Sequence, residues 1–321
     1  MIKICHVTNA HTSDDFRIFI NECTTLAKCG YKTYLVASGR DREENGVNVI
    51  GVGDKPASRK ERMGIFAKNV VDKALSLDCD IYHLHDPELQ RFIPMIARKG
   101  KKVIFDSHED YKSLILAKPW IPKPFRSFVS FAYGIFERHV CRYLSGYVAC
   151  YHWTKERVKK WVPNIELVFN YPDWQPIPYE KHSDGETNYF CYAGGIIPQW
   201  LHENVIKAIH DVSNAKYLLA GSINSDYGRQ LKTTDEWNSV EFVGRLKHNE
   251  LPEVMYSRSL AGICLLDYIP QCKGHIGNLS NTKLFEYMVN GIPVLCTDFD
   301  LWKEVIDKYQ CGKYVNPHNV D

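Results

Sequence analysis

The chain lacks three features that would each have defined its class. Its formal net charge is only +2, from 40 Lys and Arg against 38 Asp and Glu, so no field over the whole molecule would hold a nucleic acid. No apolar run reaches the roughly 18 residues of a bilayer-spanning helix, and the first residues, MIKICHVTNA, lack the basic and apolar regions of a signal peptide. We therefore expect a chain that is neither exported nor membrane-spanning.

Paired cysteines are also missing. The chain has 11 cysteines, an odd number, and none of them form a C-x-x-C pair. This pattern suits neither a disulfide framework nor a zinc knuckle, and it is typical of a protein in a reducing cytoplasm.

Short β-rich runs alternate with segments of helical period along all 321 residues. Such alternation predicts βαβ units and parallel sheets, in which strands are apolar on both faces and ligands bind at their carboxyl ends. The expected strands are 3–9, 33–38, 47–52, 80–85, 102–107 and 146–150, then 189–195, 216–222, 240–244, 261–267 and 292–298.

Between the two series lies a stretch rich in proline and polar residues, which predicts a linker at 173–188. We expect an N-terminal domain at 1–172 and a C-terminal domain at 189–321, each an α/β doubly wound unit, with a cleft between them. The first strand is not followed by G-x-G-x-x-G, which argues against a nicotinamide or flavin dehydrogenase.

The loop after the first strand, HTSDDFR, is polar and leads into an amphipathic helix that Ser13 or Asp14 would cap. A loop in this place faces the ligand edge, so His11, Asp15 and Arg17 are candidates for contact with an acceptor or a phosphate. The alternative is a solvated cap with an Arg–Asp pair.

Two later strand ends place imidazoles beside carboxylates. The residues are His85, Asp86 and Glu88 in YHLHDPEL, and Asp106, His108, Glu109 and Asp110 in FDSHEDY. Such groups supply a general base or bind sugar hydroxyls. Helix capping by Asp86 and Asp110 with packed histidines is one alternative. A metal site is another, although the two H-x-D/E pairs do not match the spacing of a closed zinc site, and we assign no metal ligand.

The segment from Lys112 to Arg142 combines cations with aromatic residues. It has six Lys and Arg against Glu137 alone, a local excess of +5. This mixture predicts a surface for an anionic membrane, and the alternative is an ordinary amphipathic helix whose Phe residues face the core. The expected membrane-facing residues are Lys118, Trp120, Lys123, Phe125 and Arg126.

In the second half, Gly194 and Gly195 end a strand, where the lack of a Cβ lets a phosphate approach. Farther on, GNLSNTKLFEYMVNGIPVLC predicts a helix opened by Ser280 and Asn281 and ended by Gly291. Lys283 and the helix N-terminus suit a diphosphate, and Glu286 suits the hydroxyls of a ribose. A well-capped amphipathic helix without a ligand is the alternative.

Taken together, four motifs resemble family 4 glycosyltransferases of the GT-B fold, most of all those of bacterial capsule and exopolysaccharide synthesis. They are HTSDDFRIFINECTTLAKCGY, YHLHDPEL, FDSHEDY and NTKLFEYMVNGIPVLCTDFDLWKEV, in the family's order over nearly the whole chain. The resemblance implies two facing Rossmann-like domains. It also implies a UDP- or GDP-sugar donor held mainly by the C-terminal domain, and transfer with retention of configuration and without a metal ion.

The resemblance also assigns residues. Glu286 matches the second glutamate of the family's Glu-x7-Glu motif, which binds the donor ribose, and Asn281, Thr282 and Lys283 match the helix start that faces the diphosphate. The expected donor residues are Gly194, Gly195, Arg245, Asn281, Thr282, Lys283 and Glu286. The expected catalytic residues are His108, Glu109, Asn278 and Lys283, and the expected acceptor residues are His11, Asp15, Arg17, His85 and Asp86.

Three departures from the family pattern carry expectations of their own. Asn278 stands where the first glutamate belongs, and an amide cannot supply its negative charge. Trp200 and His202 follow the GG loop where many relatives have a basic residue, which leaves Arg245 and Lys283 for the phosphates. The chain ends at YVNPHNVD, where relatives continue through further helices, so we expect a shortened C-terminal domain.

The leading hypothesis is a cytoplasmic glycosyltransferase, peripheral at the inner face of the membrane, that extends a glycan or lipid-linked oligosaccharide. A non-catalytic partner of the same fold, binding nucleotide or glycan within a polysaccharide-assembly complex, is the alternative that Asn278 suggests. No nucleic-acid partner is expected.

Overall fold

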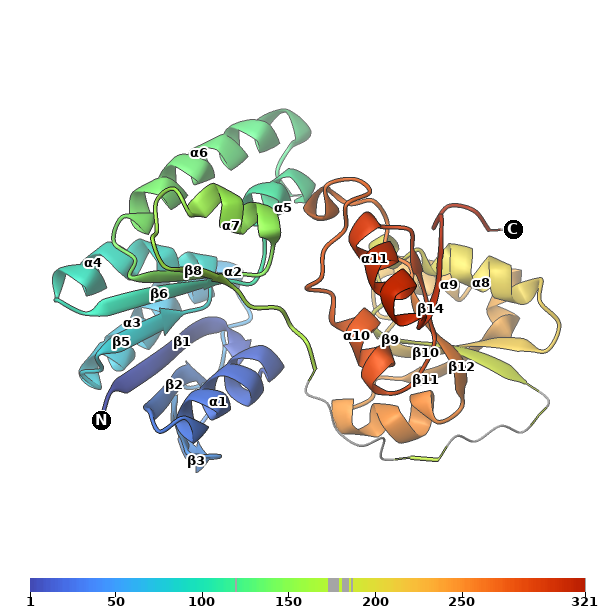
Figure 1. Ribbon diagram of the computed structural model, residues 1–321, viewed down its shortest axis with the longest axis horizontal. Coiled ribbons are helices and arrows are strands. Elements are labelled where there is room, and N and C mark those ends of the chain that lie inside the picture. The colour runs from blue at the N-terminus through green and yellow to red at the C-terminus, as the bar shows by residue number, and fades with distance from the viewer. Residues whose placement is uncertain (119, 173–178, 181–184, 186, 321) are drawn as a thin grey trace. The chain divides into compact units, whose positions relative to one another are not determined.

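The chain folds into two compact units, Met1–Phe169 and Asn170–Asp321. The structure is a computed structural model that describes residues 1–118, 120–172, 179–180, 185 and 187–320 (Figure 1). The expected N-terminal domain end at 172 lies three residues beyond this division. Most of the predicted linker, residues 173–178, 181–184 and 186, lies outside the described residues and stays a prediction.

The N-terminal unit is built on an eight-stranded sheet with the order β3-β4-β2-β1-β5-β6-β7-β8. All neighbours are parallel except β3 and β4. The strands are β1 (Lys3–Thr12), β2 (Lys32–Ser38), β3 (Arg42–Glu44), β4 (Val47–Gly51), β5 (Ile81–Leu84), β6 (Lys102–Ser107), β7 (Gly146–Ala149) and β8 (Ile165–Leu167). The helices are η1 (Phe16–Cys23), α1 (Thr24–Lys28), α2 (Arg59–Glu61), η2 (Arg62–Phe66), α3 (Ala67–Ser76), η3 (Pro87–Phe92), α4 (Ile93–Arg98), α5 (Tyr111–Ala117), α6 (Lys123–Cys141) and α7 (His152–Val158).

The second unit has a fully parallel six-stranded sheet with the order β11-β10-β9-β12-β13-β14. Its strands are β9 (Asn188–Gly195), β10 (Ala215–Ser222), β11 (Val240–Gly244), β12 (Ser259–Cys264), β13 (Val294–Thr297) and β14 (Gly312–Val315). Its helices are η4 (Pro198–Trp200), α8 (His202–His210), α9 (Asp226–Leu231), η5 (Asp235–Ser239), η6 (His248–Glu250), η7 (Pro252–Tyr256), η8 (Pro270–Cys272), α10 (Thr282–Val289) and α11 (Asp300–Tyr309).

Both sheets have the strand order of a Rossmann unit, which confirms the predicted fold class. Numbered within its own unit, the second sheet reads 3-2-1-4-5-6, and the parallel part of the first sheet begins in the same way. Every predicted strand is present; the short strands β3, β8 and β14 are additional. No helix among the described residues is long and apolar enough to cross a bilayer.

Each sheet of the fold is covered on both faces, so successive residues of a strand enter different cores. In β2, Val36 belongs to the large core of the N-terminal unit, whereas Leu35 and Ala37 belong to a smaller core formed with η1. Cys5 and Val7 of β1 also enter the large core, so the side chain between them lies on the η1 face.

Helix α10 packs tightly on the second sheet because one strand residue has no side chain. Tyr287 of α10 is 1% exposed, and a Cβ on Gly262 of β12 would lie 2.4 Å from its ring carbons. The Tyr287 hydroxyl lies 3.3 Å from the Cys191 carbonyl oxygen, which limits any movement of the ring.

We predict that Gly262→Ala lowers the free energy of unfolding of the C-terminal unit by about 1–3 kcal/mol, because the added methyl overpacks this contact. Denaturant unfolding checks this. Gly64→Ala is the matched control: Gly64 is a helical glycine with nothing within 4 Å of an added Cβ, so its variant should be at least as stable as the parent. Equal stability of both variants would contradict the tight packing.

Candidate functional site

The reversal of strand order places one switch point in each unit. It lies between β1 and β5 in the N-terminal unit and between β9 and β12 in the C-terminal unit. Ligands of doubly wound sheets bind beyond the carboxyl ends of the strands at such points. Most of the predicted site residues follow these strands or their neighbours.

The loop after β1 is braced by a buried carboxylate. Asp86 Oδ2 accepts hydrogen bonds from Thr8 Oγ1 at 2.7 Å, from the Asn9 N–H at 2.7 Å and from the Ala10 N–H at 3.0 Å. Asp86 is 1% exposed, so it holds the loop through these hydrogen bonds from within the protein interior.

The helix after this loop is capped by a different residue from the one expected. Asp15 accepts from the Ile18 N–H at 3.0 Å and is the N-cap of η1. The expectation of Ser13 or Asp14 is therefore wrong, because both side chains bind Arg42 instead.

Arg17 and Asp106 form a buried ion pair beneath the same edge. Arg17 Nε and Nη2 donate to the two carboxylate oxygens of Asp106 at 3.0 and 2.9 Å, and Arg17 is 6% exposed. Burial would raise the pKa of Asp106, but the charges of Arg17 and His108 outweigh it and hold that pKa well below its usual range. Arg17 thus supports the edge through a bidentate contact.

Three neighbouring imidazoles lie between the Arg17–Asp106 pair and the solvent. His85 is fully buried and its Nδ1 lies 3.1 Å from His108 Nε2, while the rings of His108 and His11 are 4.9 Å apart. His11, with a side chain 34% exposed, binds Asp15. Burial would lower the pKa of His11, but the Asp15 hydrogen bond and the nearby carboxylates raise it.

Glu109 completes this group of side chains. Burial raises its pKa, although the Tyr151 hydroxyl donates to Glu109 Oε2 at 2.9 Å. The structure therefore separates the predicted acceptor and catalytic residues of this unit into two layers. His11, His108 and Glu109 lie at the edge, and Arg17, His85 and Asp86 lie beneath it.

In the C-terminal unit, Lys283 is held at the end of β9. A Cβ on Gly194 would lie 2.5 Å from Nζ at the end of the flexible Lys283 side chain, and φ at Gly194 is +153°, a conformation that favours glycine. The ammonium also lies 4.9 Å from the Tyr192 ring centre and 5.5 Å from that of Trp200. Burial lowers the pKa of Lys283. Gly195, by contrast, faces open space.

Helix α10 begins and ends as its sequence predicts. Asn281 is its N-cap and accepts from the Lys283 N–H at 3.0 Å, and Gly291 follows its end with φ +63°. Thr282 and Arg245 are exposed.

Glu286 forms an ion pair one turn into α10. Its Oε1 lies 2.9 Å from Nε2 of His248, a residue of η6. The hydrogen bond to Glu286 raises the pKa of His248. Burial would raise the pKa of Glu286, but His248 and Lys283 lower it, so the pair favours an ionised carboxylate.

Asn278 points into its own loop. Its Oδ1 accepts from the Ser280 N–H at 3.0 Å, its Nδ2 lies 3.7 Å from Cys272 Sγ, and it is 8% exposed. The amide thus shapes the loop before α10.

The basic and aromatic segment of the N-terminal unit exposes its apolar residues. On α6, Phe125, Phe128 and Phe131 are 58, 69 and 65% exposed, so the core-face alternative is wrong for them. Trp120 is 57% exposed and contacts two cations, with the Arg59 guanidinium and Lys118 Nζ each 4.7 Å from its ring centre. Arg126 donates to two carbonyl groups, and Lys123 is exposed.

Comparison with protein families now adds to this geometry. Glycosyltransferase Family 4 matches residues 17–171, and Glycosyl transferases group 1 matches residues 176–321. The chain belongs to the GT-B glycosyltransferases. Curated protein sequences give no match.

Solved structures agree with this glycosyltransferase in fold. Sucrose-phosphate synthase from Thermosynechococcus elongatus has a TM-score of 0.72 at 12% identity, covering 100% of this chain and 87% of that one. A glycosyltransferase from Rickettsia africae has 0.66 at 13%, covering 99 and 85%. Anabaena HepE, in complex with UDP and glucose, has 0.65 at 13%, covering 100 and 87%.

Sequence reasoning missed several polar and aromatic residues that the structure places beside the predicted site residues. His248 is distant from Glu286 in the chain and carries no motif. The sequence marked Trp200 only as a position where many relatives have a basic residue, and it did not indicate that its ring lies beside Lys283. His6, His83 and Glu22 were also missed, although the H-x-H in YHLH gave a signal, since alternate strand residues share a face.

His202 generates a prediction on pH. It is buried beside the GG loop with Nδ1 3.0 Å from the Tyr217 hydroxyl, and burial lowers its pKa to about 4. In the unfolded chain the His202 imidazole takes up a proton near pH 6.5, whereas in the folded protein it does so only near pH 4. The free energy of unfolding therefore falls as the pH is lowered from 6.5 to 4, by up to about 3 kcal/mol.

We therefore expect His202→Gln to flatten the pH dependence of unfolding between pH 7 and 4. Denaturant titrations of both proteins at several pH values measure it. His210→Gln removes an exposed imidazole and should keep the parent's slope. A His202→Gln slope equal to the parent's would refute the assignment.

Proposed function

We propose that this glycosyltransferase moves a sugar, with retention of configuration, from a UDP- or GDP-sugar to a glycan or lipid-linked oligosaccharide of surface polysaccharide synthesis. The observation that carries the proposal is the Lys283 ammonium, held over Gly194 at the end of β9 and at the start of α10. The UDP and glucose bound to HepE support a UDP-sugar first.

The donor end follows from charge. In this proposal, Lys283 and the N–H groups at the start of α10 bind the diphosphate, and the exposed Arg245 adds a further contact. Negative charge grows on the diphosphate as the sugar leaves, and these fixed positive groups stabilise it most in the transition state. This supports transfer without a metal ion on the diphosphate.

The acceptor end follows from the exposed edge of the N-terminal unit. His11 and His108 are partly exposed, and the carboxyl group of Glu109 has a raised pKa. We assign to His108 and Glu109 two tasks: they orient the attacking hydroxyl by hydrogen bonds, and they accept its proton. Arg17, His85 and Asp86 position them.

Glu286 tests the donor site. Glu286→Gln keeps the shape but removes the charge that a ribose hydroxyl would meet, so nucleoside diphosphate affinity should fall about 10- to 100-fold. Titration calorimetry with UDP and GDP measures it, and Glu304→Gln, which changes an exposed residue of α11, is the matched control. If neither nucleotide binds the parent protein, the donor site is refuted.

A second candidate is a non-catalytic binding partner, and the inward amide of Asn278 favours it. The same titrations combined with a turnover assay separate the two. Release of nucleoside diphosphate from a donor sugar above the background rate supports the enzyme, whereas tight binding without release supports the partner.

We also propose that α6 and the preceding loop meet an anionic membrane. Its exposed Phe residues share α6 with the exposed Lys123. Arg59, which lies over the ring of Trp120, also lines a hollow of about 530 Å³ together with Lys60 and Arg91. Rings at headgroup depth and cations on lipid phosphates suit this surface.

Lys123→Glu combined with Phe128→Ser should weaken binding to phosphatidylglycerol vesicles about tenfold or more, since each cation near such a surface contributes about 1 kcal/mol. Vesicle sedimentation measures it, and salt should weaken the parent's binding. Val212→Ser, which removes an apolar side chain 55% exposed in the other unit, is the control. Equal binding of the parent to neutral vesicles would defeat the proposal.

A further inference from the structure

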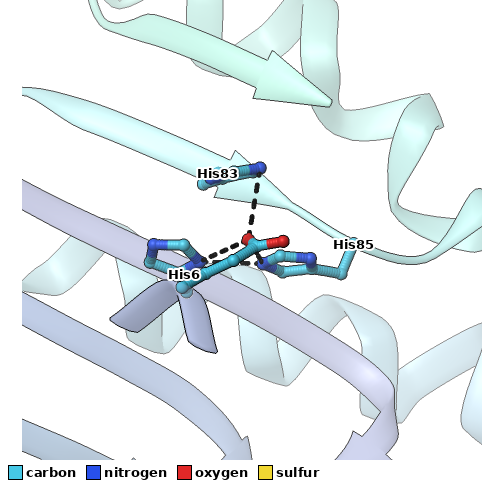
Figure 2. A group of neighbouring side chains, drawn as sticks. His6, His83 and His85 are labelled. Carbon is cyan, nitrogen blue, oxygen red and sulfur yellow. Dashed lines mark hydrogen bonds and ion pairs between the residues drawn. The ribbon is translucent and has the colours of Figure 1, made fainter. Parts of the chain in front are cut away.

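Three histidines and a glutamate meet beneath η1, and of these only His85 belongs to the acceptor group described above. His6 of β1 pairs in register with His83 of β5, and His85 follows two residues later. Their neighbours Cys5, Val7, Tyr82 and Leu84 enter the large core, so the imidazoles share the opposite face. Figure 2 shows the three rings gathered around one point. Glu22 reaches this point from η1, a π-helix.

The ligand atoms lie near one another at metal-binding range. Glu22 Oε2 is 3.8 Å from His6 Nδ1, 3.9 Å from His83 Nε2 and 4.0 Å from His85 Nε2, and His6 Nδ1 is 2.9 Å from His85 Nε2 (Figure 2). Ligand atoms of tetrahedral zinc, at about 2.0–2.1 Å from the ion, lie about 3.3 Å apart. All four ligand atoms lie within 4.8 Å of one another, so side-chain movements of about an ångström would close the group on one ion.

Several polar atoms of this group are buried without a hydrogen-bond partner. Among the described residues, His83 Nε2 and Glu22 Oε2 lie in the interior with no hydrogen bond, whereas Glu22 Oε1 forms an ion pair with Arg17, whose Nε lies 3.1 Å away. His6 and His85 are fully buried, and the His83 side chain is 10% exposed. Unpaired polar atoms in the interior are costly, and one cation would satisfy these atoms together.

The surroundings of His85 fit a metal ligand. Its Nε2 faces Glu22, while its Nδ1 lies 3.3 Å from Asp106, the carboxylate that Arg17 holds. Metal-binding histidines commonly donate their second ring N–H to a carboxylate, which fixes the tautomer and orients the ring. Asp106 provides this support from β6.

We propose that His6, His83, His85 and Glu22 bind one divalent cation of the zinc class. Three neutral imidazoles and one carboxylate are ligands that suit Zn²⁺, and the Glu22 charge offsets part of the charge of the ion. The ion joins β1 and β5 to η1 and so fixes the helix that follows the acceptor loop. Its role is structural.

The purified full-length protein tests this directly. After removal of metal with a chelator, titration with Zn²⁺ should show one equivalent bound and a rise in melting temperature. Co²⁺ should give the intense visible absorption of a tetrahedral site, which an octahedral surface site lacks. A protein that binds no equivalent of Zn²⁺ and shows no such absorption overturns the proposal, because a shared proton then suffices to hold the four side chains.

Two variants locate the site. Glu22→Gln and His83→Gln should each weaken Zn²⁺ binding about 100-fold or more, and His210→Gln, which removes an exposed imidazole elsewhere, should not. Binding in which either cluster variant equals the parent overturns the assignment. If a variant does not fold, the Co²⁺ spectrum of the parent decides, since tetrahedral absorption supports the site and its absence refutes it.

Discussion

The constraint on which this molecule depends is that its parallel sheets are covered on both faces. Strand residues in such sheets enter a core whichever way they point, so a polar side chain within a strand needs a buried partner. Beyond the ends of the strands, a polar side chain reaches solvent and does not need a buried partner. The groups that suit a donor and an acceptor therefore gather beyond β1, β5, β6 and β9, and the switch in strand order decides which of these ends are neighbours.

Two ways of meeting that constraint coexist in the N-terminal unit. The Asp106 carboxylate is buried with a bidentate arginine, which keeps the carboxylate ionised and supports the loop residues above it. The nearby histidines of β1 and β5 are buried with fewer partners than their atoms require. Together they form a polar layer between the sheet and η1.

The C-terminal unit meets the constraint with aromatic rings. Lys283 loses water when it is buried, and the faces of Tyr192 and Trp200 replace part of that hydration while leaving the ammonium at the strand end. The glycine at 194 makes room for it, and the glycine at 262 lets α10 lie close to the sheet. These two glycines thus leave room for the Lys283 side chain and for the helix that carries it.

The sequence by itself determined the two Rossmann-like units, their main strands and the limits of α10, because these depend on local periodicity and on capping and turn residues near in the chain. It also indicated Lys283 and Glu286 through a motif on one helix. Only the tertiary structure decided which polar residues lie at the surface and which beneath it, as for His108 over His85. It alone brought His248 to Glu286 and Glu22 to His6, since these contacts join segments whose distance in space no local pattern records.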